Sequence, residues 1–176
     1  MTNKVPFSTY ADVNPHRQLQ RGKTYPFVEM AAIPEGGGSV RYFQERTFDS
    51  GGTRYAVGDT LFARITPCTE NGKVSKVTDL NGLQVGFGST EFIVLAAKKG
   101  VSDPNFLYQL AISDRVRKAA VRRMLGSSGR QRVPNWFFQD ELMLPVFTLP
   151  EQHAIAAILD SIDEAIQRTE EADTQV

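Results

Sequence analysis

Basic side chains that could bind a polyanion are concentrated between Arg115 and Arg132. This segment holds seven arginines and lysines and no acidic residue. Five of the seven recur at helical spacing: Arg115, Arg117, Lys118, Arg122 and Arg123. Clustered positive charge of this kind is typical of contacts to nucleic acid phosphates, although a solvated helix face has the same composition. We expect some of the five to bind phosphates and the others only to solvate the helix.

Polar side chains in predicted loops could recognise bases. In the major groove, guanidinium groups pair with guanine, and side-chain amides pair with adenine. We expect base contacts first from Asn71, Arg130, Gln131 and Arg132, and second from Arg64 and Lys73. Affinity would come mainly from phosphate contacts, and specificity from these few side chains.

The residues needed for catalysis are scarce. None of the glycine-rich stretches ends in the Gly-Lys-Ser/Thr of a phosphate-binding loop. His16 and His153 lie near opposite ends of the chain, and with Cys68, the single cysteine, they give too few ligands for a structural zinc site. No tetrapeptide of the Asn-Pro-Pro-Tyr type marks a methyltransferase pocket. We expect no metal, no cofactor and no catalytic residue.

The net charge of zero conceals a separation of charge along the chain. Residues 1–150 carry 19 basic and 13 acidic side chains, whereas residues 151–176 carry seven acids and one arginine. At 176 residues, with 41% hydrophobic residues, the chain can bury one core. The sequence contains neither a long apolar run nor a secretory leader, so we expect a cytoplasmic protein that does not contact membranes.

The hydrophobic pattern predicts an α+β fold, a mixed β-rich domain with packed helices. We expect strands at 25–33, 39–48, 61–65, 91–96 and 142–147, and helices at 104–113, 114–124 and 151–171. Asp103 followed by Pro104 is a good helix start. The first twenty residues show no periodicity, which favours a loop or a loosely attached arm.

The last predicted helix would be one long coiled-coil segment. Thr148 and Glu151 have the spacing of a capping box, which marks its start. At 1.5 Å per residue, the helix over 151–171 would be roughly 30 Å long. Its apolar residues recur every three or four positions: Ile155, Ile158, Leu159, Ile162 and Ile166. This edge either binds a partner helix or folds back on its own domain, and the two alternatives stay open.

Several segments resemble the specificity subunits of type I restriction-modification systems. Residues 58–73 (Gly-Asp-Thr-Leu-Phe-Ala-Arg-Ile-Thr-Pro-Cys-Thr-Glu-Asn-Gly-Lys), 88–95 and 126–134 are similar, in the right order, to parts of the family's target recognition domains. Leu-Pro-Glu-Gln at 149–152, with the isoleucines that follow, resembles the entry to the family's spacer helix. The resemblance implies a target recognition domain over 1–148 and a spacer or dimerisation helix over 149–176.

The resemblance also implies a function. Such a domain would be a non-catalytic subunit that recognises one half of a bipartite site in double-stranded DNA and docks modification subunits and, through them, restriction subunits. Full-length members carry two such domains and two helices, so this chain resembles a half-subunit that would pair with itself as a homodimer through the C-terminal helix. A fragment of a two-domain subunit is one alternative. A stand-alone DNA-binding repressor or decoy and a protein–protein assembly adaptor are two others.

Overall fold

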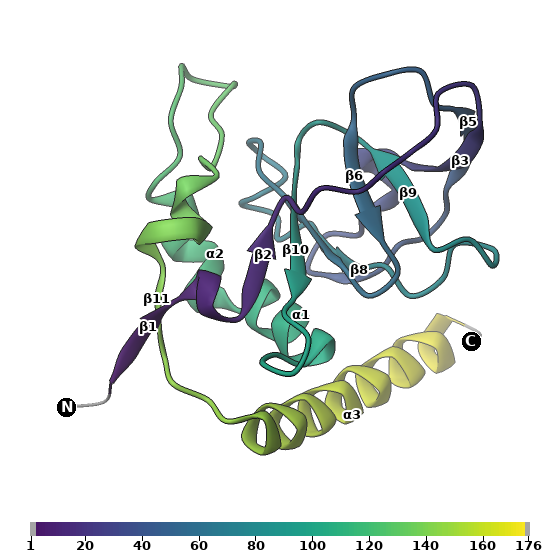
Figure 1. The fold of residues 1–176 in the computed structure, drawn as a ribbon. Helices are drawn as coiled ribbons and strands as arrows, with labels where there is room; N and C mark the ends of the chain where they lie inside the picture. Colours follow the sequence, from purple (N-terminus) through teal and green to yellow (C-terminus); the bar gives the residue numbers. More distant parts are fainter. Residues whose placement is uncertain (1–2, 175–176) are drawn as a thin grey trace.

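The structure, a computed structural model, describes residues 3–174, and of residues 170–174 only the backbone. It is an α+β domain with a long C-terminal helix beneath it (Figure 1). The strands are Lys4–Pro6 (β1), Ala11–Val13 (β2), Thr24–Val28 (β3), Gly38–Ser39 (β4), Gln44–Thr47 (β5), Thr53–Ala56 (β6), Thr60–Ala63 (β7), Val74–Lys76 (β8), Val85–Gly88 (β9), Phe92–Ala97 (β10) and Met143–Pro145 (β11). The helices are Pro104–Ile112 (α1), Asp114–Val121 (α2) and Leu149–Thr174 (α3), with short helical turns at Phe7–Thr9 (η1), Met30–Ala32 (η2) and Phe137–Glu141 (η3).

The main sheet has five strands in the order β2-β10-β7-β8-β4. All its pairings are antiparallel except β4 with β8. A second sheet has the order β5-β3-β9-β6, and β1 pairs with β11 in a third. All four residues of β7 are buried, as are the first five of β10, which agrees with the apolar runs that predicted these strands.

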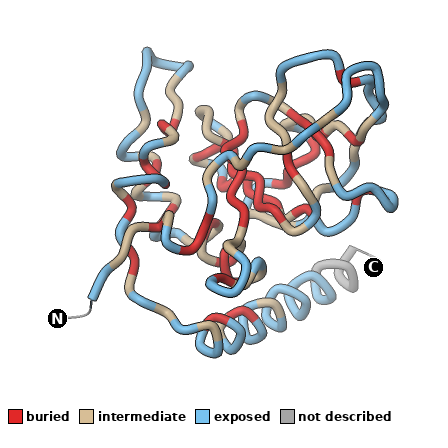
Figure 2. Tube along the Cα trace, viewed as in Figure 1, coloured by how far each residue is buried: buried red, intermediate tan, exposed pale blue. Residues whose placement is uncertain are grey.

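Two apolar clusters form the core. In the first, the aromatic rings of Phe7, Phe62 and Phe138 pack edge to face between the five-stranded sheet and the helical turns, with centroids about 5 Å apart. In the second, Tyr55 and Leu61 are fully buried between the two larger sheets. The buried segments gather along these two regions in Figure 2.

The prediction of a loose N-terminal arm was wrong. Phe7 is fully buried in the first cluster, and β2 forms an edge of the five-stranded sheet. The backbone N–H of Phe7 donates to the carbonyl of Leu142 at 2.7 Å, next to the β1–β11 pair. The start of the described chain is therefore fastened to the segment that leads into α3.

The two short helices begin as expected. The Asp103 carboxylate accepts a hydrogen bond from the Phe106 N–H at 2.9 Å, which caps α1. The Ser113 hydroxyl caps α2 by accepting from the Val116 N–H at 3.3 Å. Helix α2 ends at Val121, three residues before the predicted end at Met124, and the chain then turns into the projecting loop of Figure 1.

Helix α3 packs along α1, and its first turns hold it there. The Glu151 carboxylate accepts hydrogen bonds from the Thr148 N–H at 2.7 Å and from the Thr148 hydroxyl at 2.8 Å. The predicted capping box is thus half formed, because the hydroxyl donates to Glu151 instead of accepting a backbone N–H. Gln152 and Ala156 are buried against the domain. Within residues 3–174, no helix is both long and apolar enough to cross a membrane.

Candidate nucleic-acid interface

Loops from distant parts of the chain meet at one end of the five-stranded sheet. Because Phe92 pairs with Ala63, the start of β10 and the end of β7 lie at the same end. The antiparallel β2 also finishes there, since the Asn14 N–H donates to the Val94 carbonyl at 2.7 Å. We call this surface the loop end, formed by residues 14–17, 64–66, 88–91 and 125–135. It lies in the upper part of Figure 1, on the side of the molecule away from α3.

The most prominent part of the loop end is a hairpin at 125–132. Leu125 and Arg132 exchange backbone hydrogen bonds of 2.9 Å in both directions. Gly126 has φ +122°, and a Cβ there would lie 2.9 Å from the carbonyl oxygen of Arg130, so the tight return of the chain requires glycine. The Thr66 N–H donates to the Gln131 carbonyl at 3.0 Å, which attaches the hairpin to the segment after β7. Arg130 is exposed, and Gln131 is half-buried.

Arg132 is held by an acidic neighbour. Its Nε lies 2.9 and 3.0 Å from the two carboxylate oxygens of Glu91, and its Nη2 lies 2.7 Å from one of them. The hydrogen bonds and charge of Glu91 raise the pKa of Arg132. Its Nη1 donates to the Arg130 carbonyl at 3.0 Å. Arg132 therefore supports the hairpin, and its charge is compensated.

Arg64 lies beside this pair. It is half-buried, and its Nη1 donates to the side-chain oxygen of Asn135 at 3.2 Å. Burial lowers the pKa of Arg64; the Glu91 carboxylate opposes that shift, and the positive charge of Arg132 adds to it. The buried Nε of Arg64 has no hydrogen-bond partner among the described residues.

Two of the six predicted base-contacting residues lie elsewhere. The side-chain amide of Asn71 donates to the Glu35 carboxylate at 2.8 Å. Lys73 is half-buried, and its Nζ donates to the carbonyl of Met30 at 3.3 Å. The structure therefore brings Arg64, Arg130, Gln131 and Arg132 together at the loop end and directs Asn71 and Lys73 toward residues 30–35.

The predicted phosphate-binding residues also divide. Arg117 and Lys118 both pair with Asp114, Lys118 at 2.9 Å, and these cations lower the pKa of Asp114. Arg123 pairs with Glu141. In contrast, Arg115 and Arg122 are exposed, and their side chains make no ion pair or hydrogen bond with any side chain or backbone that the structure describes. These two are the members of the basic helix segment most available to a ligand.

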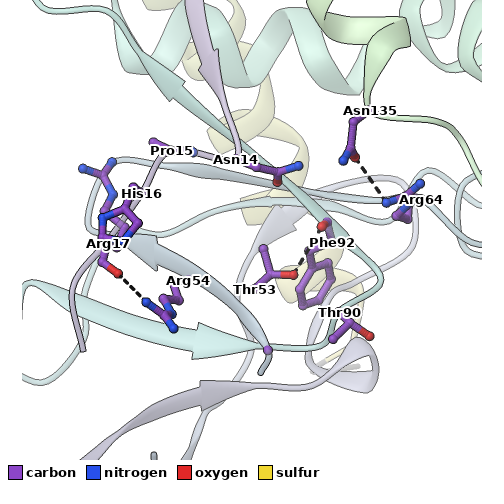
Figure 3. Close-up of a pocket in the computed structure, with 11 residues that line it drawn as sticks. Asn14, Pro15, His16, Arg17, Thr53, Arg54, Arg64, Thr90, Phe92 and Asn135 are labelled. Atoms are coloured by element: carbon purple, nitrogen blue, oxygen red, sulfur yellow. Dashed lines mark hydrogen bonds between the residues drawn. The ribbon is translucent and has the colours of Figure 1, made fainter. Parts of the chain in front are cut away.

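A trough beside the loop end contains two arginines, Arg17 and Arg54, that were not among the predicted DNA contacts. It has a volume of about 500 Å³, and it runs from Arg17 and Arg54 to Arg64 and Asn135 (Figure 3). Arg17 was not predicted as a DNA contact because its segment was expected to be a loose arm. Arg54 lies between Thr53 and buried Tyr55 on β6, where strand alternation alone explains a polar residue.

An ion pair between half-buried Arg17 and buried Asp59 fixes one end of the trough. Nη2 of Arg17 lies 2.9 and 3.0 Å from the two carboxylate oxygens of Asp59. Burial raises the pKa of Asp59, and the Ala56 N–H and the Arg17 charge oppose that shift. Nη1 of Arg54 donates to the Arg17 carbonyl at 3.0 Å, and the Arg54 guanidinium lies 5.0 Å from the Phe48 ring centroid. Both arginines are therefore positioned before any ligand arrives.

Comparison with known proteins identifies the family. No family model matches the chain. It is 36% identical over 150 residues to the type I restriction enzyme EcoAI specificity subunit of Escherichia coli, a match covering 82% of this chain and 25% of that subunit. It is 39% identical over 92 residues to the EcoEI specificity subunit of the same organism, covering 51% of this chain and 15% of that subunit. The chain belongs to the family of type I restriction enzyme specificity subunits.

The fold agrees with this membership. The crystal structure of the HsdS subunit from Thermoanaerobacter tengcongensis superposes with a TM-score of 0.77 at 19% identity, over 97% of this chain and 44% of that chain. The chain thus corresponds to a single domain of a longer specificity subunit. The sequence segments 58–73, 88–95 and 126–134, which carried the resemblance to specificity subunits, each contribute residues to the loop end.

The apolar edge of α3 is not covered by the rest of the described chain. We use this name for Ile158, Leu159, Ile162 and Ile166, which are 62%, 36%, 49% and 51% exposed. Ile155, at the start of the predicted seam, is half-buried. At 3.6 residues per turn, the apolar edge lies about a quarter of a turn from the face that carries Gln152 and Ala156. Helix α3 therefore packs on its own domain through one face and leaves the adjacent apolar edge open.

No candidate metal site lies within the described range. Among residues 3–174, no three His, Cys, Asp or Glu side chains come together in a way that could hold a metal ion. Cys68 is partly buried, and burial raises the pKa of its thiol. Reactive thiols have a lowered pKa, so Cys68 has the properties of a packing residue.

Proposed function

We propose that the chain is the DNA target recognition domain of a type I specificity subunit and that the loop end recognises one half of a bipartite site. Membership of the family supports a role in specificity without catalysis. The observation that carries the DNA-binding role is a group of arginines with no ion pair in the described chain: exposed Arg130 on the hairpin of the loop end, and Arg54 and Arg64 at opposite ends of the adjoining trough.

The residues would divide the work of binding. Arg130 and Gln131, near the tip of the hairpin, are suited to base edges, since Arg pairs with guanine and Gln with adenine in the major groove. Arg115 and Arg122 lack partners in the described chain and are suited to phosphates, whose contacts give affinity without sequence preference. Arg132, bound to Glu91, would hold the hairpin in shape.

The apolar edge of α3 would serve assembly. Four large aliphatic side chains along one helix edge form a contiguous apolar strip, which marks an interaction surface. We propose that the edge pairs with the helix of a second recognition domain, supplied by another copy of this chain or by the remainder of a longer subunit, and that the pair docks modification subunits and, through them, restriction subunits.

The test is to co-express the chain with a cognate type I modification subunit and to map methylated adenines across a plasmid of known sequence. Methylation at a split inverted repeat would support a self-paired specificity subunit. Co-purification without methylation would indicate that the chain needs a second domain. Failure to co-purify would contradict the docking role and favour a stand-alone repressor or decoy, or an adaptor.

A further inference from the structure

We propose that the trough between Arg17 and Asn135 is a seat for the sugar–phosphate backbone of one DNA strand, with one phosphate bound at each end. This inference rests on the proposed function and deepens it, because it assigns phosphate contacts to residues outside the basic helix. The trough is open to solvent, as a continuous polymer strand requires.

At one end, Arg54 supplies charge without a counterion. The Asp59 carboxylate neutralises Arg17. The side chain of Arg54 has no ion pair with any acid in the described chain, and its one hydrogen bond is to the neutral carbonyl of Arg17. That bond and the Phe48 ring hold the guanidinium in place. The Arg54 side chain is therefore ordered before a phosphate binds, which reduces the entropy cost of binding.

At the other end, Arg64 also has no direct ion pair within the described residues. Glu91 makes its direct ion pair with Arg132, and among the described residues the one hydrogen-bond partner of the Arg64 guanidinium is the neutral amide of Asn135. Its buried Nε lacks a hydrogen-bond acceptor among the described residues, and burial already lowers its pKa. An incoming phosphate would supply the counter-charge that this half-buried guanidinium lacks.

The lining between the two ends suits a sugar. Figure 3 shows Thr53, Thr90 and Phe92 between the arginines at one end, Arg17 and Arg54, and the Arg64–Asn135 pair at the other. Thr90 is exposed, and Phe92 is buried. The Thr53 hydroxyl donates to the Phe92 carbonyl at 3.4 Å, which leaves the exposed Thr90 hydroxyl to face a ligand. A hydroxyl beside an aromatic ring matches the mixed polar and apolar character of a deoxyribose and its linking phosphates.

The position of the trough also orients the DNA. The Val133 N–H donates to the Arg64 carbonyl at 2.8 Å, so the hairpin rises directly from the Arg64 end. A strand seated in the trough would therefore bring an adjoining groove of the duplex to Arg130 and Gln131. Seating of the backbone and recognition of bases would depend on one another through this short connection.

The first test is the salt dependence of duplex binding by the full chain and its variants. Each lost phosphate contact reduces the slope of log K against log salt by about 0.9 and weakens binding about eightfold at 0.1 M salt. We expect both effects for Arg54→Gln and an equal or larger loss of affinity for Thr90→Glu, which places a negative charge in the trough while both arginines remain. Lys99→Gln, at the opposite end of β10 and exposed, should leave the slope unchanged.

The second test maps the phosphates directly by ethylation interference. We expect interference at two phosphates of one strand in each half-site, with the signal of one lost in Arg54→Gln. Circular dichroism spectra and melting curves establish that the variants fold. Unchanged salt slopes in both trough variants overturn the proposal. Binding of inorganic phosphate in the trough, without ethylation interference on DNA, overturns it as well.

These failures are distinguishable from failure of the proposed function. The slope is measured on both random and selected duplexes, because phosphate contacts do not depend on sequence. A selected motif whose binding ignores the trough variants overturns the trough alone. Absence of any preferred sequence overturns the proposed function. In that case the salt slopes of the parent and the trough variants on random DNA still test whether the trough binds phosphates.

Discussion

Replacing Gln152 by Met should loosen α3 from the domain, because this one side chain makes three hydrogen bonds to the backbone. Its Oε1 accepts from the Asp103 N–H at 3.0 Å. Its Nε2 donates to the carbonyls of Val101 at 3.0 Å and Phe147 at 3.1 Å. Gln152 is fully buried, and Met keeps the length and helix propensity of Gln while removing the amide.

The expected loss follows from these three bonds. A hydrogen bond contributes about 1 kcal/mol net to stability, so the substitution should lower the free energy of unfolding by about 3 kcal/mol. For a chain of this size, that corresponds to a fall in Tm of roughly 6–12 °C. The change should appear as a lower urea midpoint with an unchanged m-value, followed by circular dichroism and by the fluorescence of the single tryptophan, Trp136.

The matched control is His153→Gln on the same turn of α3. The His153 side chain is 61% exposed, and its nearest acidic atom, on Asp103, is 3.5 Å away. An exposed site of this kind should change stability by less than about 0.5 kcal/mol. If Gln152→Met falls within the same limit, α3 is not held to the domain by Gln152, and the packing described for its first turns is wrong.

Three further changes test other parts of the molecule. Ile162→Asp should abolish self-association by light scattering while leaving the melting curve of the domain unchanged, and an unchanged mass would show that the apolar edge makes no interface. Arg130→Ala should cost about 1–3 kcal/mol of binding and relax preference at one base position, whereas equal loss on every sequence would reassign Arg130 to a phosphate. Hydrogen bonds from the Thr148 N–H and hydroxyl lower the pKa of Glu151. The carboxylate therefore stabilises the fold above the ordinary pKa of a glutamate, and this stabilisation is lost as the pH falls through the lowered pKa. Glu151→Gln should therefore be less stable than the parent near neutral pH and should lose less stability on acidification in urea titrations; an identical pH dependence would exclude the cap.

Elements with strong local patterns were predictable from sequence. β10 is a short β-branched run, α1 begins at an Asp-Pro pair, and α3 repeats its isoleucines every three or four residues. Each pattern lies within a few neighbouring residues, so periodicity and capping suffice to locate the element. The α+β class and the long last helix followed from these signals.

The N-terminal segment could not be predicted, because its order comes from distant partners. β1 and β2 have three residues each, too few to show alternation. Phe7 is buried by Phe138, which lies far away in the sequence. Such tertiary contacts override weak local propensity, so the prediction of a loose arm was wrong.

The candidate site was predictable only in part for the same reason. Residue type and loop position sufficed to select Arg130 and Gln131. Whether an arginine is free depends on acids from other elements, as with Glu91 beside Arg132 and Asp59 beside Arg17. Those pairings arise from sheet register, which the sequence does not display, so the trough and the compensated arginines emerged only from the structure.

The most direct test of DNA recognition by the loop end is selection of bound duplexes from a randomised library by the purified chain, in parallel with an Arg130→Ala/Gln131→Ala variant. We expect the parent chain to enrich a short defined motif and the variant to lose preference at positions within it while still binding DNA. Enrichment of the same motif by both proteins, or of none by the parent chain, would contradict recognition of DNA sequence by the loop end.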